Sequence, residues 1–430
     1  MIMFYKLIYL AGIKRRNPSL LPYFEFLKET DRWSIDKLRV YQFEKCREFL
    51  IFARNNSPFY QEHFAKAGFV PERMQSVDDL KQIPPIDKII LLEYGDRIRT
   101  NYSFRRLLFS ETSGTSGQVL RFYRNEEWDS HNRAAMFRGY GWYGVNPWLK
   151  NGYFWGYDTA KRQYWKTAFL DALQNRFRLF SYDAAHIRQF VEKLKGAEFL
   201  TGYSSMIYEV AKIINRLNIG AEFNLKMIKG TSEKICESYQ TEVQKAFGRK
   251  IISEYGSAES GLIAFECPEG GHMHINMENV VVEEENGEII VTNLLSRSFP
   301  IIRYRLGDFV KLASSDFKCS CGRAHPVVLD VLGRVGKNVI GKKSIYPSLT
   351  FYYVFKNLVK NGGISLNYQA EQHEKGKVLL RIEQDEAGRL PALEMELAKY
   401  FRHDIEFEIR WGEVLHSMDG KLKDFVTTLN

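Results

Sequence analysis

Between residues 153 and 250 the sequence alternates between short apolar runs and amphipathic segments, and this pattern limits the fold more than any other feature. Residues 225–229 and 251–253 are short apolar runs typical of buried strands. Residues 187–194 and 206–217 carry apolar side chains at helical spacing. Strands that alternate with helices form a largely parallel sheet covered by helices, so we predict an α/β fold.

The segments on either side of this alternation predict additional parts. Residues 1–100 have a mostly helical pattern. Residues 275–315 are rich in β-branched side chains, with Asn286-Gly287 as a turn, and predict a small barrel or antiparallel sheet. Residues 345–430 alternate between helix and strand again, which is typical of a small α+β domain.

The length of 430 residues exceeds what one hydrophobic core usually serves. We therefore expect a large N-terminal domain and a small C-terminal domain with a boundary near residue 335. The N-terminal domain would comprise a helical front segment at 1–100 and a core at 101–335 that includes the small β subdomain. The C-terminal domain would span 336–430.

A Ser/Thr/Gly-rich segment at 110–117 follows the apolar run Leu107-Leu108-Phe109. Glycines let backbone N–H groups approach a ligand closely, and hydroxyl groups add further donors. Such a loop suits an anion, most readily a phosphate. It is not a Walker loop, because Gln118 follows the last glycine where that motif has lysine. A surface turn without a ligand is the alternative interpretation.

Two further segments combine an aromatic or a glycine with a carboxylate. Residues 254–259 follow an apolar run and contain Tyr255, Gly256 and Glu259. The aromatic ring can stack on a flat base, and the carboxylate can hold Mg²⁺, which prefers oxygen ligands and substrate phosphates. Residues 303–308 end in Gly307-Asp308, whose carboxylate can accept both hydroxyls of a ribose. Taken singly, each segment is equally typical of a structural turn.

Two basic segments complete the set. Arg334 lies between glycines at the domain boundary, where it can reach a phosphate while the glycines act as a hinge. Lys421 lies in Gly420-Lys421-Leu422-Lys423, and a lysine can neutralise charge that develops on a phosphate under attack.

In this order and spacing the five segments resemble the adenylate-forming superfamily, in particular its phenylacetate–CoA ligase-like branch. That branch includes the CapK-like proteins of capsular polysaccharide biosynthesis and the coenzyme F390 synthetase group, and the resemblance covers nearly the whole chain. It implies that Lys421 promotes adenylation and that Glu259 binds Mg²⁺. The nucleotide contacts that it implies are Thr112, Ser113, Gly114, Thr115, Ser116 and Gly117 for the phosphates, Gly230, Thr231, Ser232, Glu233, Tyr255 and Gly256 around adenine, and Asp308 and Arg334 for ribose or phosphate.

The resemblance implies a two-step reaction. A small carboxylic acid attacks the α-phosphate of ATP to give an acyl-adenylate and pyrophosphate. The mobile C-terminal domain then rotates, and an acceptor takes the acyl group: the thiol of CoA, or an amine or hydroxyl of a sugar in surface polysaccharide biosynthesis. Gln118 and the Arg334-Val335-Gly336 hinge depart from the usual pattern, which leaves adenylation expected and thioester formation open. The alternatives are an adenylyltransferase with a hydroxyl acceptor and a non-catalytic nucleotide-binding or membrane-surface protein.

Five cysteines in 430 residues do not form a disulfide framework, so we expect a reducing, cytoplasmic location. Three thiolates and one imidazole would close a tetrahedral structural zinc site. We assign Cys267, His274, Cys319 and Cys321, with His272 or His325 as a replacement. The phenylacetate–CoA ligase-like branch often has cysteine, histidine and a Cys-x-Cys-Gly-Arg segment here. Free buried thiols are the alternative.

The net charge of +9 is concentrated at the front, because residues 1–60 hold eleven Lys or Arg and six Asp or Glu. Residues 1–13 are apolar, interrupted by Lys6, and too few to span a bilayer, which takes about 20 apolar residues. They predict either a first helix packed on the body, which we favour, or an amphipathic helix that contacts a membrane surface. No nucleic-acid-binding motif is present, and we expect no nucleic acid partner.

Overall fold

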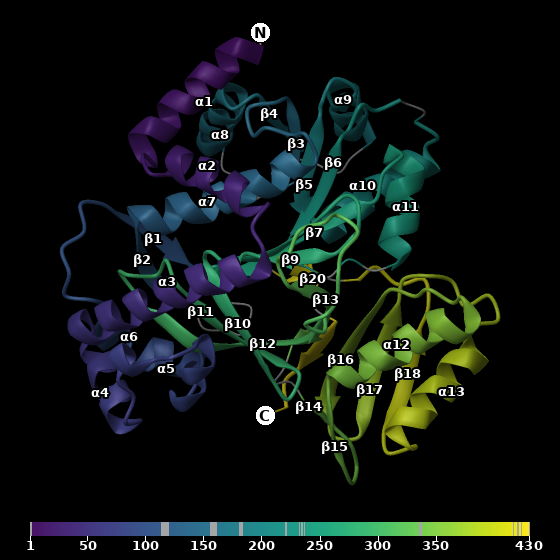
Figure 1. Ribbon diagram of the computed structural model, residues 1–430. Helices are drawn as coiled ribbons and strands as arrows, with labels where there is room; N and C mark the ends of the chain where they lie inside the picture. The colour runs from purple at the N-terminus through teal and green to yellow at the C-terminus, as the bar shows by residue number, and fades with distance from the viewer. Residues whose placement is uncertain are drawn as a thin grey trace.

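One mixed sheet of eleven strands forms the centre of the protein (Figure 1), with the strand order β10-β11-β12-β13-β9-β8-β7-β6-β5-β3-β4. The computed structural model describes residues 2–112, 120–154, 161–179, 184–219, 222–231, 233, 235, 237–334, 338–415, 417–418, 421–422 and 424–429. The parallel half consists of β3 (Asn151–Phe154), β4 (Arg176–Arg178), β5 (Phe199–Tyr203), β6 (Met227–Thr231) and β7 (Ile251–Ser257). The antiparallel half consists of β8 (Gly261–Glu266), β9 (Met273–Ile275), β10 (Val280–Glu285), β11 (Glu288–Asn293), β12 (Ile301–Leu312) and β13 (Val327–Arg334).

Helices cover both faces of the parallel half, as predicted for an α/β fold. One layer contains α9 (Ala184–Leu194), α10 (Ser204–Arg216) and α11 (Glu237–Phe247). The other contains α1 (Ile2–Arg16), α2 (Leu20–Thr30) and α7 (Glu126–Trp142), while α8 (Lys161–Leu173) lies beside α1. Successive strand residues point to opposite faces. Ile228 accordingly belongs to the core under α10, and Met227 to the core under α7.

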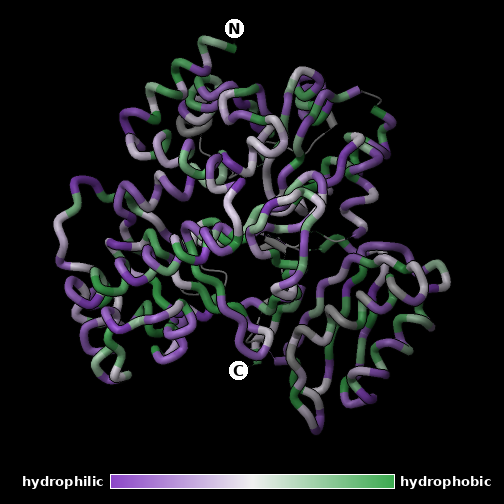
Figure 2. The backbone as a smooth tube through the Cα atoms, in the orientation of Figure 1, coloured by the Kyte–Doolittle hydropathy of each residue, from purple (hydrophilic) through white to green (hydrophobic). Residues whose placement is uncertain are grey.

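The front segment packs on the antiparallel half. It is helical, as predicted, and comprises α3 (Ile35–Asn56), α4 (Pro58–Lys66), α5 (Lys88–Glu93) and α6 (Gly95–Ile98), with short 3₁₀ turns at Pro71–Arg73 and Val77–Gln82. Buried Leu38 and Phe49 share a core with Val280 and Ile289 of the sheet. Figure 2 shows these central strands as mostly green, hydrophobic segments. The predicted antiparallel sheet is present, and it continues into the parallel strands as one sheet.

The turn between β10 and β11 lies where the sequence predicts it. Asn286 and Gly287 both have positive φ, at 55° and 83°. Two successive residues with positive φ are what a type I′ hairpin turn requires, and Asn-Gly tolerates this conformation best. The turn fixes the register in which Val282 lies opposite Val291.

The C-terminal residues form a smaller α+β unit with its own core. Its four-stranded sheet has the order β18-β17-β16-β21, and its core includes Phe351, Leu380, Leu393 and Phe401. The elements are β14 (Asn338–Ile340), β15 (Ile345–Pro347), α12 (Leu349–Gly362), β16 (Tyr368–Glu374), β17 (Lys377–Ile382), α13 (Leu390–Phe401), β18 (Glu406–Arg410), β19 (Ser417–Met418), β20 (Lys421–Leu422) and β21 (Phe425–Thr427). The predicted boundary near 335 falls at residues 335–337, which lie outside the described residues.

His131 of α7 gives the fold a predictable pH dependence. Its ring stacks on Tyr23 with the centroids 3.6 Å apart, and burial lowers the pKa of His131 to about 4. In the unfolded chain this imidazole binds a proton below about pH 6.5, whereas in the folded chain it stays neutral down to about pH 4. The unfolded state therefore binds more protons in this window, and stability falls as the pH falls.

We expect His131→Phe to lose less stability than the wild type as the pH falls from 6.5 to 4, with a difference of about 3 kcal/mol at pH 4. The phenyl ring preserves the stacking on Tyr23 and removes the titrating group. Urea unfolding at a series of pH values measures the difference. His403→Asn, which removes an exposed histidine, should follow the wild-type curve. Parallel curves for His131→Phe and the wild type would contradict this prediction.

Candidate active site

The predicted phosphate loop connects two paired strands. Strands β1 (Leu107–Glu111) and β2 (Arg121–Asn125) form an antiparallel hairpin. At its open end the Thr112 amide donates to the Leu120 carbonyl, and the Leu120 amide donates to the Thr112 hydroxyl, both at 3.0 Å. These two bonds hold the ends of the loop together. The predicted phosphate ligands Ser113, Gly114, Thr115, Ser116 and Gly117, and Gln118 with them, lie outside the described residues.

Gly230, predicted to line the adenine site, has a clear local reason to be glycine. A Cβ atom at this position would lie 2.4 Å from the Ser204 hydroxyl at the start of α10. Glu233, also assigned to the adenine site, accepts a hydrogen bond from the Ser205 amide at 2.8 Å. Its carboxylate thus caps the N-terminus of α10, where negative charge is favoured. Thr231 donates to Glu254 at 3.3 Å, and Ser232 lies outside the described residues.

Tyr255 and Asp308, predicted from separate segments, lie in contact. The Tyr255 hydroxyl donates to the Asp308 carboxylate at 2.9 Å. Asp308 is also the cross-strand neighbour of Arg334 in the register of β12 and β13. Gly256 allows the chain to turn beside them, because a Cβ atom there would lie 2.3 Å from the Gly261 carbonyl oxygen. The fold therefore brings the predicted base-stacking, ribose-binding and phosphate-binding positions to one place.

Glu259, the predicted Mg²⁺ ligand, lies in the turn between β7 and β8 and is only 6% exposed. Two contacts hold this turn: Arg124 donates to the Ala258 carbonyl at 2.6 Å, and Asn293 donates to the Glu259 carbonyl at 2.9 Å. Burial lowers the pKa of Arg124, while the carboxylates of Asp129 and Glu259 act in the opposite direction. The turn thus presents a buried carboxylate next to a buried guanidinium.

A cavity of about 350 Å³ lies along the face of the parallel strands that α7 covers. Its lining includes Gly202 of β5, Thr231 of β6, Glu254 of β7 and Tyr140 of α7. The volume is in the range of small-molecule sites. Its polar lining by Arg133, Arg176 and Lys229 could not be predicted, because these residues occur in no recognisable motif.

A buried ion pair forms part of this cavity wall. The Lys229 ammonium lies 2.6 Å from the Glu254 carboxylate, and the Lys229 side chain is 5% exposed. Burial alone would lower the pKa of Lys229, but Glu254 and the nearby Tyr140 raise it, so the ammonium stays charged. Lys229 lies in β6 and Glu254 in the adjacent strand β7, so strand pairing brings the two side chains together. Each directly precedes a residue predicted to contact the nucleotide, since Gly230 follows Lys229 and Tyr255 follows Glu254.

Lys421, the predicted catalytic lysine, lies in the C-terminal unit, and the structure describes its backbone. Its strand β20 pairs with β19, with Lys421 opposite Met418. The unit contacts the layer of α10 and α11 through Glu383, which accepts a hydrogen bond from Tyr208 at 3.0 Å and forms an ion pair with Lys212. For Arg334, too, the structure describes the backbone, which lies at the end of β13.

The four residues predicted to bind zinc form a cluster. The ligand atoms of Cys267, His274, Cys319 and Cys321 all lie within 4.8 Å of one another. The Cys267 and Cys319 sulfurs are 3.6 Å apart, close to the edge of about 3.8 Å that a tetrahedron with Zn–S bonds of about 2.3 Å would have. A Cβ atom at Gly270 would lie 2.2 Å from the Cys319 sulfur, so glycine is required beside the cluster. The donor set and its spacing fit a tetrahedral metal.

The predicted replacement ligands have separate roles in the structure. The His325 ring contacts Glu278 at 3.0 Å, and its backbone carbonyl lies 3.0 Å from Nδ1 of His274. With Nδ1 engaged in this hydrogen bond, Nε2 of His274 faces the Cys321 sulfur, and the two atoms are 3.1 Å apart. Such outer partners commonly fix the tautomer of a metal-binding histidine. Nδ1 of His272 lies 3.6 Å from the Cys319 sulfur.

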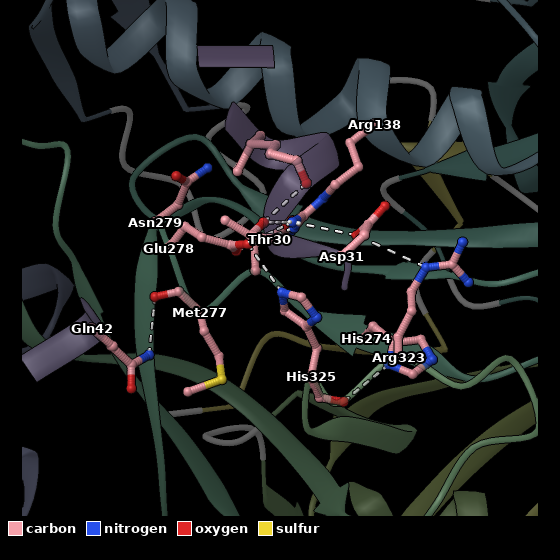
Figure 3. A network of polar contacts seen from close by, with 12 residues as sticks. Thr30, Asp31, Gln42, Arg138, His274, Met277, Glu278, Asn279, Arg323 and His325 are labelled. Carbon is pink, nitrogen blue, oxygen red and sulfur yellow. Dashed lines mark hydrogen bonds and ion pairs between the residues drawn. The ribbon is translucent and has the colours of Figure 1, made fainter. Parts of the chain in front are cut away.

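A buried polar network continues from this cluster to the helices (Figure 3). Arg138 of α7 is 2% exposed and contacts the fully buried Glu278 carboxylate at 2.7 Å. Burial alone would raise the pKa of Glu278, but Arg138 and His325 hold it well below the usual range. Thr30 and Asp31, at the end of α2, also contact Arg138. No sequence motif predicted this network, because its members come from four distant segments.

Comparisons with known proteins agree with this architecture. No protein-family model matches the chain. The CapK protein of Staphylococcus aureus is 26% identical over 285 residues, which cover 63% of this chain and 62% of CapK. A phenylacetate-coenzyme A ligase of Pseudomonas putida is 22% identical over 372 residues, 79% of each chain.

Among solved structures, 2-hydroxyisobutyryl-CoA ligase in the postadenylation state, in complex with R3-HIB-AMP, has a TM-score of 0.70. It is 14% identical and covers 93% of this chain and 91% of its own, which shows a shared fold. In sequence this chain is similar to CapK and to the phenylacetate-coenzyme A ligases, and it shares the fold of 2-hydroxyisobutyryl-CoA ligase.

Proposed function

We propose that this chain is an ATP-dependent ligase that activates a small carboxylic acid as its acyl-adenylate. The observation that carries the proposal is the contact between Tyr255 and Asp308, with Arg334 as the cross-strand neighbour of Asp308. Three positions expected to bind one nucleotide are thereby adjacent, although each comes from a different segment. The relationship to phenylacetate-coenzyme A ligase supports the same reaction class.

Each group has a defined task in this proposal. The Asp308 carboxylate accepts the ribose hydroxyls, and the loop after Thr112 donates to the phosphates. Glu259 holds Mg²⁺, which would neutralise phosphate charge. Lys421 stabilises the charge that develops on the α-phosphate as the substrate carboxylate forms its bond to phosphorus and pyrophosphate leaves. Ser113 to Gly117, Gly230 to Glu233 and Gly256 line the rest of the nucleotide site.

The acid would bind in the cavity between β5, β6, β7 and α7. Its wall combines the rings of Tyr140 and Tyr153 with the charged side chains of Arg133, Arg176 and Glu254. A polar lining of this kind favours a small acid with further hydrogen-bonding groups over a purely aryl acid. Tyr140 and Tyr153 belong to the Trp- and Tyr-rich segment 140–157.

We propose two acceptors. The thiol of CoA is supported by the relatives that carry CoA in their names. An amine or hydroxyl of a sugar is supported by the resemblance to the CapK-like proteins of capsular polysaccharide biosynthesis. In either case the C-terminal unit at 336–430 would turn relative to the core at 101–335 and the front segment at 1–100. We place this chemistry in the cytoplasm, where ATP is available.

Pyrophosphate release with ATP, Mg²⁺ and a panel of small acids tests the proposal. We expect release with at least one acid, with polar acids preferred to phenylacetate. Addition of CoA or of amino sugars then identifies the acceptor by the product formed. Protein that binds ATP yet releases no pyrophosphate with any acid would instead be a non-catalytic binding module. AMP transfer to a hydroxyl acceptor without an acid would indicate an adenylyltransferase.

We also propose that Cys267, His274, Cys319 and Cys321 bind a structural zinc ion. The cluster joins the β8–β9 hairpin to the connection between β12 and β13. Four protein ligands leave no open position for a substrate, so the metal would stabilise the fold and take no part in the reaction.

We expect about one zinc per chain in protein purified without chelators, because a closed four-ligand site holds one ion. Cys319→Ser should lose most of this zinc and unfold at a lower temperature. Cys46→Ser, which changes a buried cysteine outside the cluster, should keep it. Elemental analysis and thermal unfolding provide the measurements, and equal zinc content in all three proteins would contradict the assignment.

A further inference from the structure

Helix α1 exposes large apolar side chains along its first two turns. Ile2, Met3, Phe4 and Leu7 are 57–70% exposed, whereas Ile13 is the buried residue of the helix. Met3 and Leu7 are four residues apart and lie on one face. The opposite face packs on the protein through Tyr9, whose ring contacts Phe137 and Trp148. The helix is thus held at the edge of the protein with an apolar side turned to solvent.

The neighbouring helix α8 exposes apolar side chains as well. Trp165, Phe169 and Leu170 are 46–73% exposed, and α8 lies beside α1 at the periphery in Figure 1. Of the nineteen exposed large hydrophobic residues in the described part of the chain, seven belong to these two helices. Single exposed apolar residues are ordinary, but such a concentration marks an interaction surface.

The charge of this surface has one sign. Helix α1 carries Lys6, Lys14, Arg15 and Arg16 and has no acidic residue. Its last turn is basic, so apolar residues near the start of the helix are followed by three cationic residues at its end. Helix α8 adds an exposed lysine, Lys166, and its Asp171 is buried. An anionic partner would be attracted here, and a cationic one repelled.

We infer that the exposed face of α1 and α8 docks on the surface of an anionic lipid bilayer. A helix that presents aromatic and aliphatic side chains to solvent, with basic residues beside them, can lie in the plane of such an interface. A second copy of this chain is disfavoured as the occupant, since a two-fold contact through this face would bring its basic residues together. The described residues contain no helix of the length and hydropathy that crossing a bilayer requires, so the contact would be peripheral.

The docking face is connected to the cavity described above. Tyr9 lines that cavity and belongs to the same helix as Phe4 and Leu7. One helix therefore forms part of the cavity wall with its inner face and presents apolar residues with its outer face. The inference itself depends on the exposed residues and their charge, and it stands whether or not the cavity binds an acid.

Vesicle co-sedimentation with the full-length chain tests the inference. We expect binding to vesicles of phosphatidylcholine mixed equally with phosphatidylglycerol and little binding to pure phosphatidylcholine. Salt at about 0.5 M should weaken the binding, because it screens charges beyond a few ångströms. Phe4→Gln/Leu7→Gln should reduce the affinity by about tenfold or more, and Lys14→Gln/Arg15→Gln should reduce it at low salt.

Ile89→Ser is the matched control, because Ile89 is 66% exposed on α5, away from the two helices. It should bind as the wild type does. Circular dichroism and thermal unfolding should be unchanged in all variants, which separates docking from folding. Failure of the wild type to bind anionic vesicles at low salt would overturn the inference. So would equal binding by Phe4→Gln/Leu7→Gln, or a wild-type dimer in analytical ultracentrifugation that this variant dissociates.

Discussion

Glu278→Gln should lower the free energy of unfolding by about 3–5 kcal/mol, because it leaves the buried Arg138 guanidinium without its counter-charge. Glu278 is fully buried and accepts from Thr30, Arg138 and His325. The other carboxylate near Arg138 belongs to Asp31, at 3.7 Å, and it also faces Arg323. Glutamine keeps the shape of the side chain, so the loss would come from the charge and from the mismatched amide donor.

Urea unfolding followed by tryptophan fluorescence measures this effect. The double variant Glu278→Gln/Arg138→Met should be less destabilised than the sum of the two single changes, because it removes both members of the pair. Glu285→Gln provides the matched control. Glu285 is 43% exposed and pairs with Arg305, so its loss should cost less than about 1 kcal/mol. Similar unfolding midpoints for Glu278→Gln and Glu285→Gln would contradict this prediction. They would mean that Asp31 can serve as the counter-charge of Arg138 in place of Glu278.

Lys421→Ala should slow adenylate formation by about 10²-fold or more, if the lysine stabilises charge on the α-phosphate. Its task requires the C-terminal unit to face the nucleotide site, and Glu383 provides one contact between the two parts through Tyr208 and Lys212. The measurement is single-turnover pyrophosphate release with ATP and an acid that the wild type accepts. ATP binding should change little, since the interaction strengthens in the transition state.

Lys399→Ala is the control, because Lys399 is an exposed lysine of the same unit and pairs with Glu396 at the surface. It should release pyrophosphate at the wild-type rate. When acyl-adenylate is supplied, acyl transfer by Lys421→Ala should also match the wild type. An unchanged rate of pyrophosphate release in Lys421→Ala would remove this lysine from the proposed mechanism without affecting the assignment of the fold.

Several features could be predicted because they depend on neighbouring residues. The apolar runs that became β6 and β7 and the helical spacing of α10 were visible in the sequence. So was the turn at Asn286-Gly287, whose positive φ values follow from the two residue types. The cysteine and histidine cluster was predicted from the donor chemistry together with the family resemblance. Its members needed only to converge, and the structure brings them together.

Other features could not be predicted because they depend on strand order. The β-rich segment was expected as a separate barrel or sheet, yet the three-residue strand β9 joins it to the parallel strands through β8 and β13. The cavity wall of Arg133, Arg176 and Lys229 comes from α7, β4 and β6, and no spacing in the sequence relates these positions. The place of α1 beside α8 is equally a matter of packing.

By itself the sequence determined the α/β class and supplied the residues that we propose for the nucleotide and metal sites, because periodicity, turn preference and ligand type are properties of short segments. The tertiary structure decided which of these residues meet. Tyr255 and Asp308 are 53 residues apart, and Arg138 and Glu278 are 140 apart. Contacts over such separations are fixed by the register and order of strands, to which the whole core contributes. The same packing decided that α1 turns Tyr9 inward and leaves Phe4 and Leu7 exposed.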